Sequence, residues 1–144
     1  MMSKSKPVTA KRTREEYLEQ STCTSKCIYH VIFTPKYRRS VLVGKIAMRL
    51  KKLISEKGDE FGYVLHKLVV EPDHVHLIIQ CPPDPGIGAV VGKIKSYTAM
   101  VLRREFVELT TRLPCLWTRS KFVMSVGEVD NEVIDKYIHE QKNV

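Results

Sequence analysis

The 144-residue sequence contains no long uncharged hydrophobic run, which excludes a membrane-spanning helix. No apolar segment follows the N-terminal Met1-Met2-Ser3-Lys4, so we expect no secretory signal and a cytoplasmic protein. We find neither an internal repeat nor a second domain. The length suits one domain with a substantial hydrophobic core.

The sequence also lacks the cysteine pattern of a disulfide framework or a zinc knuckle. Its four cysteines are Cys23, Cys27, Cys81 and Cys115. Only Cys23 and Cys27 are close in sequence, and no second close pair completes a zinc site. We therefore expect ordinary buried or half-buried thiols.

Positive charge is in excess. The net charge is +8 and the isoelectric point is about 9.4, which favours a polyanionic partner, most commonly nucleic acid. Residues 1–25 have no strong apolar period and are predicted to form a basic, flexible arm before a single domain at 26–144. The candidate nucleic-acid contacts, for which solvated surface charge is the alternative, are Lys36, Tyr37, Arg38, Arg39, Lys93, Lys95, Arg103 and Arg104.

Hydrophobic periodicity predicts an α+β protein. Strands are expected at 27–33, 61–70 and 74–79, with a last one formed by 116–117 and 122–126. Helices are expected at 44–57, from Ile87 to about Glu108, and after Asp130. Pro72 marks a tight connection that makes the second and third strands a hairpin. This order is the ferredoxin-like βαββαβ arrangement with an antiparallel sheet and an extra C-terminal helix.

Two histidines interrupt the apolar strand 74–79. Alternation along a strand places His74 and His76 on one face, about 7 Å apart at Cα. Val75, Leu77 and Ile79 form the opposite face, which we expect to pack under the helices. The pair could bind a metal, act in catalysis or fill a core. A histidine-triad hydrolase would need a third histidine where Ile78 stands. His30, in the first strand, is predicted to be a hydrogen-bonded core histidine.

The last predicted helix offers partners for the histidine pair. Tyr137 and Gln141 are four residues apart and share one helical face. Gln141 has a carbonyl oxygen to offer a metal, and the phenol of Tyr137 is a nucleophile if a cation or base assists it. Alternatively, Tyr137 belongs to the apolar stripe of this helix and is simply a core residue.

Taken together, these residues resemble the HUH single-tyrosine transposases of the smallest insertion sequences, the IS-two-hundred type. The resemblance rests on His74-Val75-His76-Leu77-Ile78, on Tyr29-His30-Val31-Ile32-Phe33 leading into Lys36-Tyr37-Arg38-Arg39, on Lys93-Ile94-Lys95-Ser96, on Leu116-Trp117, and on the segment 133–141. They span about Lys26 to Gln141 in the family's order.

The resemblance implies a ferredoxin-like homodimer that cleaves and rejoins single-stranded DNA carrying hairpins, without a nucleotide cofactor. His74, His76 and Gln141 would be ligands of a divalent metal, and Tyr137 would attack a phosphate to give a 5′-phosphotyrosine. Imidazole ligands alone favour zinc or a similar ion. The family precedent is magnesium or manganese, which also suits a glutamine oxygen with phosphate oxygens, and we follow it. Family resemblance also favours a composite site that takes Tyr137 from the partner subunit.

A different class remains open, a non-catalytic nucleic-acid-binding module on the same fold. RNA-recognition domains of this kind stack bases on exposed aromatic residues of their central strands. This chain has His74 and His76 there instead, which disfavours that alternative.

Overall fold

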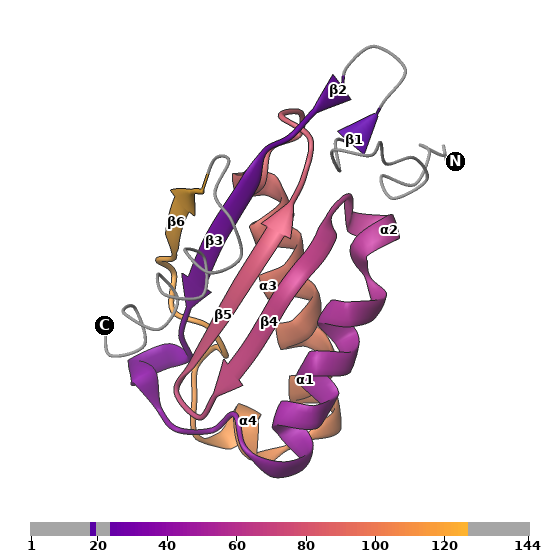
Figure 1. Cartoon of the computed structure of the whole chain (residues 1–144). Coiled ribbons are helices and arrows are strands. Elements are labelled where there is room, and N and C mark those ends of the chain that lie inside the picture. The colour runs from indigo at the N-terminus through magenta and orange to yellow at the C-terminus, as the bar shows by residue number, and fades with distance from the viewer. Residues whose placement is uncertain (1–17, 20–23, 127–144) are drawn as a thin grey trace.

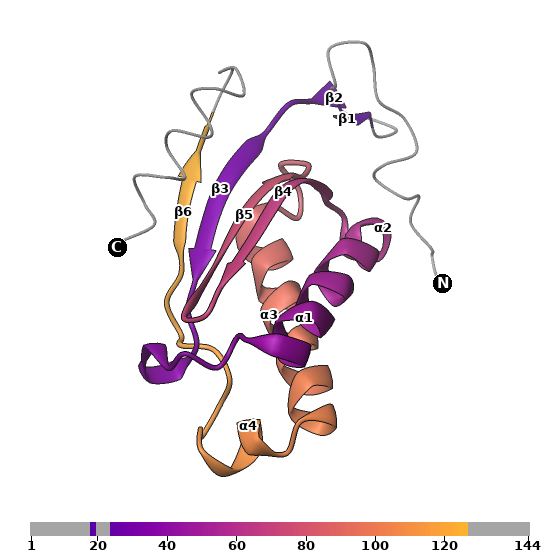
Figure 2. The same ribbon diagram turned by 60° about the horizontal axis from the view of Figure 1, so that its bottom comes forward.

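The computed structural model of the chain describes residues 18–19 and 24–126. A four-stranded antiparallel sheet has the strand order β4-β5-β3-β6, and α1 and α3 cover one of its faces (Figures 1 and 2). The strands are β3 (Ile28–Phe33), β4 (Val64–Glu71), β5 (His74–Gln80) and β6 (Phe122–Ser125). The helices are α1 (Gly44–Glu56), α2 (Gly58–Phe61), α3 (Ile87–Glu105) and α4 (Glu108–Thr111). This order and pairing confirm the predicted ferredoxin-like fold.

The two central strands, β5 and β3, are largely buried, and each lies between two neighbouring strands. Every residue of β5 is buried, and β3 is buried except at Tyr29. Ile32 of β3 pairs with His76 of β5, and Val31 pairs with Leu77. β4 and β5 form the predicted hairpin, with Glu71 paired to His74 across the turn at Pro72. Register between these strands therefore decides which side chains surround the histidines.

The helices bury one apolar stripe each against the sheet. α1 buries Ile46, Leu50, Leu53 and Ile54, the residues whose spacing predicted the helix. They join one hydrophobic core with Val75, Leu77 and Ile79 of β5. Ile78 lies outside this core and packs with Ile28. The prediction that the helices cover the Val75 face, and leave His74 and His76 on the other, is confirmed.

Several predicted boundaries differ from those observed. Phe61 ends the short helix α2, and β4 begins at Val64 because Gly62, with φ of 87°, terminates the helix in a left-handed conformation. The long helix ends at Glu105, and Glu108 begins the separate α4. Within the predicted N-terminal arm, β1 (Leu18–Glu19) pairs with β2 (Thr24–Ser25). The predicted C-terminal helix lies outside the described residues.

Candidate functional site

The two histidines of β5 lie on the sheet face that α1 and α3 do not cover. His74 is 6% exposed and His76 is 1% exposed, so both imidazoles are buried. Their ring centroids are 4.6 Å apart, with the ring planes nearly perpendicular at 82°. The strand alternation that predicted a shared face is thus realised as direct ring contact.

Asp73 holds the first histidine. Its Oδ1 lies 2.6 Å from Nδ1 of His74, and its Oδ2 lies 3.3 Å from Nε of Arg38. Partial burial raises the pKa of the Asp73 carboxyl, but the hydrogen bond and charge of His74, with the charge of Arg38, outweigh this and lower it. The carboxyl is therefore ionised and bridges the turn Lys36–Arg38 to the His74 strand.

A third histidine lies beside the pair. Nε2 of His30 is 3.4 Å from Nδ1 of His76, although 46 residues separate the two in sequence. Burial lowers the pKa of His30, and the neighbouring His76 lowers it further, to about 4. Burial is the larger of the two causes. His30 is therefore a buried histidine with a ring-nitrogen partner, as predicted. Its place next to His76 was not predicted, and only the β3–β5 register could have indicated it.

The donor set of this face suits a metal ion. Within the described residues, Nε2 of His74 is buried and has no hydrogen-bond partner, an arrangement that metal coordination would satisfy. Nε2 of His76 is buried as well. The part of the chain that the structure describes has no cluster of three His, Cys, Asp or Glu residues able to hold a metal. His74 and His76 thus offer two imidazoles, and a metal bound to them would take its further ligands from other groups.

The two remaining predicted site residues, Tyr137 and Gln141, lie outside the described residues. The structure therefore leaves their relation to the histidines as a prediction.

The predicted nucleic-acid contacts at 36–39 form an exposed turn after β3. The 3₁₀ turn Lys36–Arg38 carries two non-glycine residues with positive φ, Tyr37 at 60° and Arg38 at 53°. Tyr37 is 64% exposed, and the charged groups of Lys36 and Arg39 lie 5.4 Å and 6.0 Å from its ring centre. Consecutive left-handed residues are strained, and such strain is concentrated at functional sites.

The four basic candidates on α3 divide into two pairs. Lys93 and Arg104 are exposed. Lys95 is half-buried, and its Nζ donates to the carbonyl oxygens of Thr118 at 2.7 Å, Ser120 at 3.2 Å and Arg119 at 3.4 Å. Arg103 donates to the carbonyls of Pro114 and Leu113. Lys95 and Arg103 therefore bind the 113–120 segment to α3, a structural role that their charge alone did not indicate.

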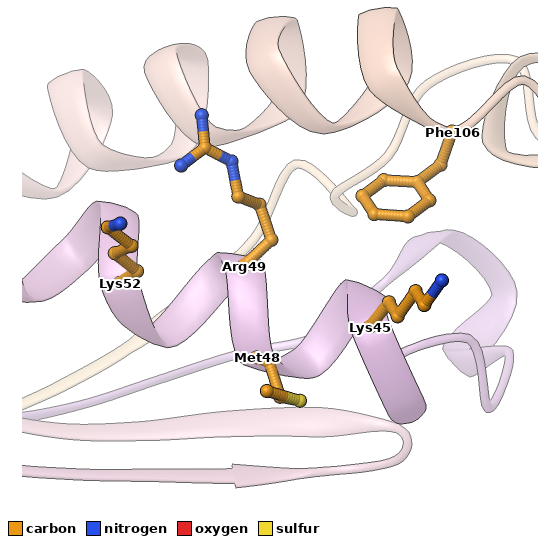
Figure 3. A pocket seen from close by; sticks show the side chains of 5 residues that line it. All are labelled: Lys45, Met48, Arg49, Lys52 and Phe106. Atoms are coloured by element: carbon orange, nitrogen blue, oxygen red, sulfur yellow. The ribbon is translucent and has the colours of Figure 1, made fainter.

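A shallow pocket lies on the helical side of the sheet. It measures about 360 Å³ and is lined by Lys45, Met48, Arg49, Lys52 and Phe106 (Figure 3). Arg49 makes two hydrogen bonds of 2.9 Å to the carboxylate of Glu105 at one side of it. It lies away from the histidine face and was not predicted.

The sequence of this chain is similar to those of known proteins. Residues 23–141 match the family model described as "Transposase IS200 like". The ISDra2 transposase TnpA of Deinococcus radiodurans is 33% identical over 115 residues, which cover 78% of this chain and 82% of that protein. The transposase for insertion sequence element IS200 of Salmonella typhimurium is 27% identical over 127 residues, covering 79% and 76%.

Solved structures of transposases share the fold. A protein of Deinococcus radiodurans R1, described as a transposase, superposes with a TM-score of 0.68 at 31% identity, covering 85% of this chain and 96% of that one. A REP-associated tyrosine transposase bound to a REP hairpin superposes with a TM-score of 0.56 at 18% identity, covering 85% and 67%. No helix in the described part of the chain has the length and hydrophobicity needed to span a bilayer.

Proposed function

Since the chain belongs to the IS200-like transposase family, we propose that it cleaves and rejoins single-stranded DNA through a covalent bond to Tyr137. The phenolic oxygen of Tyr137 attacks a backbone phosphorus, and the bond from phosphorus to the 3′ oxygen breaks. The products are a 5′-phosphotyrosine and a free 3′-hydroxyl, which takes up the proton that the phenol loses. The covalent link preserves the phosphodiester for rejoining, which suits strand transfer better than hydrolysis.

His74 and His76 hold a divalent metal in this proposal, with Gln141 as the third ligand and magnesium or manganese as the ion. The observation that carries it is the pair of buried imidazoles on one sheet face, with Nε2 of His74 lacking a hydrogen-bond partner in the described residues. When bound, the ion polarises the scissile phosphate and stabilises its developing charge. The histidines bind and orient; they do not attack.

The DNA substrate carries hairpins, and the exposed turn 36–39 with Lys93 and Arg104 contacts its phosphates. The net charge of +8 supports a polyanionic partner, and a relative of the same fold is known bound to a REP hairpin. The chain acts as a homodimer, in which each composite site combines His74 and His76 of one subunit with Tyr137 of the other.

The test is formation of a covalent adduct that survives denaturation. We expect the wild-type protein, incubated with manganese and hairpin-forming single-stranded DNA from either side of its coding sequence, to give a band of protein joined to DNA. Tyr137→Phe should give none while still retarding the DNA in a native gel. An adduct of undiminished yield with Tyr137→Phe would remove the nucleophile assignment. Metal-independent binding with no cleavage by the wild type would favour a non-catalytic binding module.

A further inference from the structure

We propose that Asp73 and His30 are positioning residues that hold Nδ1 of His74 and of His76, so that both Nε2 atoms face the metal with a free electron pair. The inference rests on the proposed function for the presence of a metal. The contacts of Asp73 with His74 and of His30 with His76 are observed in the protein itself. Each of the two proposed ligands has its Nδ1 engaged by a different residue outside the ligand set.

For His74 the partner is an anion. The ionised carboxylate of Asp73 can only accept hydrogen bonds, so at 2.6 Å the proton between the two atoms belongs to Nδ1 of His74. A neutral imidazole protonated at Nδ1 has its electron pair on Nε2. That is the atom which is buried and unpaired within the described residues. Asp73 is itself fixed by Arg38 at 3.3 Å.

For His76 the partner is another imidazole. Two charged rings in a buried contact repel each other, so at most one of His30 and His76 is charged, and one of the two facing nitrogens donates to the other across 3.4 Å. If Nδ1 of His76 donates, its Nε2 can bind a metal. If Nε2 of His30 donates, Nε2 of His76 keeps its proton and cannot. The proposal requires the first arrangement, with His30 protonated at Nδ1.

The two partners also fix ring orientation. His74 and His76 stand nearly perpendicular, at 82°, and each ring could otherwise turn about its χ2 angle. A hydrogen bond to the nitrogen remote from the metal sets both the tautomer and the direction of the ligating atom. Loss of such a partner commonly weakens metal affinity about 10- to 100-fold.

Ring-nitrogen chemical shifts of the metal-free, nitrogen-15-labelled protein test the proposal directly. In the neutral form of each ring we expect the single proton of His74 and of His76 to be on Nδ1. Asp73→Ala should release His74 into a mixture of tautomers, and His30→Leu should do the same for His76. Asp73→Asn and His30→Gln keep an accepting oxygen and should preserve the Nδ1–H form. A neutral wild-type His74 or His76 whose single proton is on Nε2 would overturn the proposal.

Manganese titration by calorimetry supplies the second readout. We expect Asp73→Ala and His30→Leu to bind manganese about 10- to 100-fold more weakly than wild type, and the Asn and Gln variants to recover most of the loss. Arg38→Gln, which breaks the ion pair that fixes Asp73 but keeps the carboxylate itself, should weaken binding less than Asp73→Ala does. Undiminished affinity in both Asp73→Ala and His30→Leu contradicts the positioning role. Nδ1–H tautomers in a wild type that binds no metal would instead refute the proposed metal function alone.

Discussion

Nζ of Lys95 lies 2.7 Å from the carbonyl oxygen of Thr118, so a basic residue of α3 holds the segment that leads into β6. The same ammonium reaches two further carbonyls of this segment, and burial lowers its pKa. From the sequence, Lys95 was predicted to contact DNA. In the structure its ammonium group instead donates hydrogen bonds to backbone carbonyls of the protein.

Lys95→Met should therefore affect stability, and Lys93→Met should affect DNA binding. Loss of the charge-assisted hydrogen bonds of Lys95 is expected to lower the free energy of unfolding by about 1.5–3 kcal/mol, measured by urea denaturation. Lys93 is exposed, so its replacement should change stability by less than about 0.5 kcal/mol. It should instead reduce the salt dependence of DNA affinity by about one phosphate contact. Equal stability of the two variants would contradict this division.

Thr98 anchors the only tryptophan of the chain. Nε1 of Trp117 donates to the hydroxyl of Thr98 at 3.0 Å, and its ring packs edge-on against Phe33 with centroids 4.6 Å apart. Thr98→Val keeps the shape but leaves the buried N–H without its acceptor, so we expect a loss of about 1–3 kcal/mol. Urea unfolding followed by tryptophan fluorescence measures it, and Thr98→Ser is the matched control that retains the hydroxyl. Similar losses in both variants would mean that packing, rather than this hydrogen bond, stabilises the site.

The helix stripes, the hairpin at Pro72 and the orientation of His74 and His76 could all be predicted from the sequence. Each depends on local periodicity or on the conformational limits of proline. Both are properties of residues that are close together in the sequence. The contact between His30 and His76 could not, because it depends on the register of two strands joined through β4 and α1. The hydrogen bonds of Lys95 to the 118–120 segment could not be predicted either. Exposed and half-buried lysines occur at the same helical positions beside an apolar stripe, so the sequence does not distinguish them.

His30 makes the stability of the metal-free protein depend on pH. Burial and His76 lower its pKa from 6.5 to about 4, so between these values the unfolded chain binds a proton that the folded chain does not. The free energy of unfolding should fall by up to about 3 kcal/mol as pH drops from 6.5 to 4, and this contribution should level off below 4. Urea denaturation at a series of pH values, with a chelator present, measures the slope.

His30→Gln should flatten that slope because it removes the titrating ring. Ile32→Val, on the same sheet face, is the control, since it should lower stability by about 0.5–1.5 kcal/mol equally at every pH. A slope unchanged in His30→Gln would assign the pH dependence to other groups.

We expect Tyr37 to lower the stability of the fold and to strengthen DNA binding. Its φ of 60° favours glycine, so Tyr37→Gly removes backbone strain while it also removes an exposed aromatic ring. We expect the Gly variant to be about 1 kcal/mol more stable than Tyr37→Ala, which keeps the strain. Both should bind single-stranded DNA more weakly than wild type, because they lose a stacking surface. Fluorescence anisotropy with labelled DNA measures the affinity; unchanged binding in both variants would remove Tyr37 from the interface.

The central claim is a division of labour, in which His74 and His76 hold the metal and Tyr137 makes the attack. The measurement that tests it most directly compares wild type with His76→Ala on hairpin-forming single-stranded DNA with manganese, read on one native and one denaturing gel. We predict that His76→Ala retards the DNA on the native gel but forms no covalent adduct on the denaturing gel. A His76→Ala adduct formed at the wild-type rate would contradict the account.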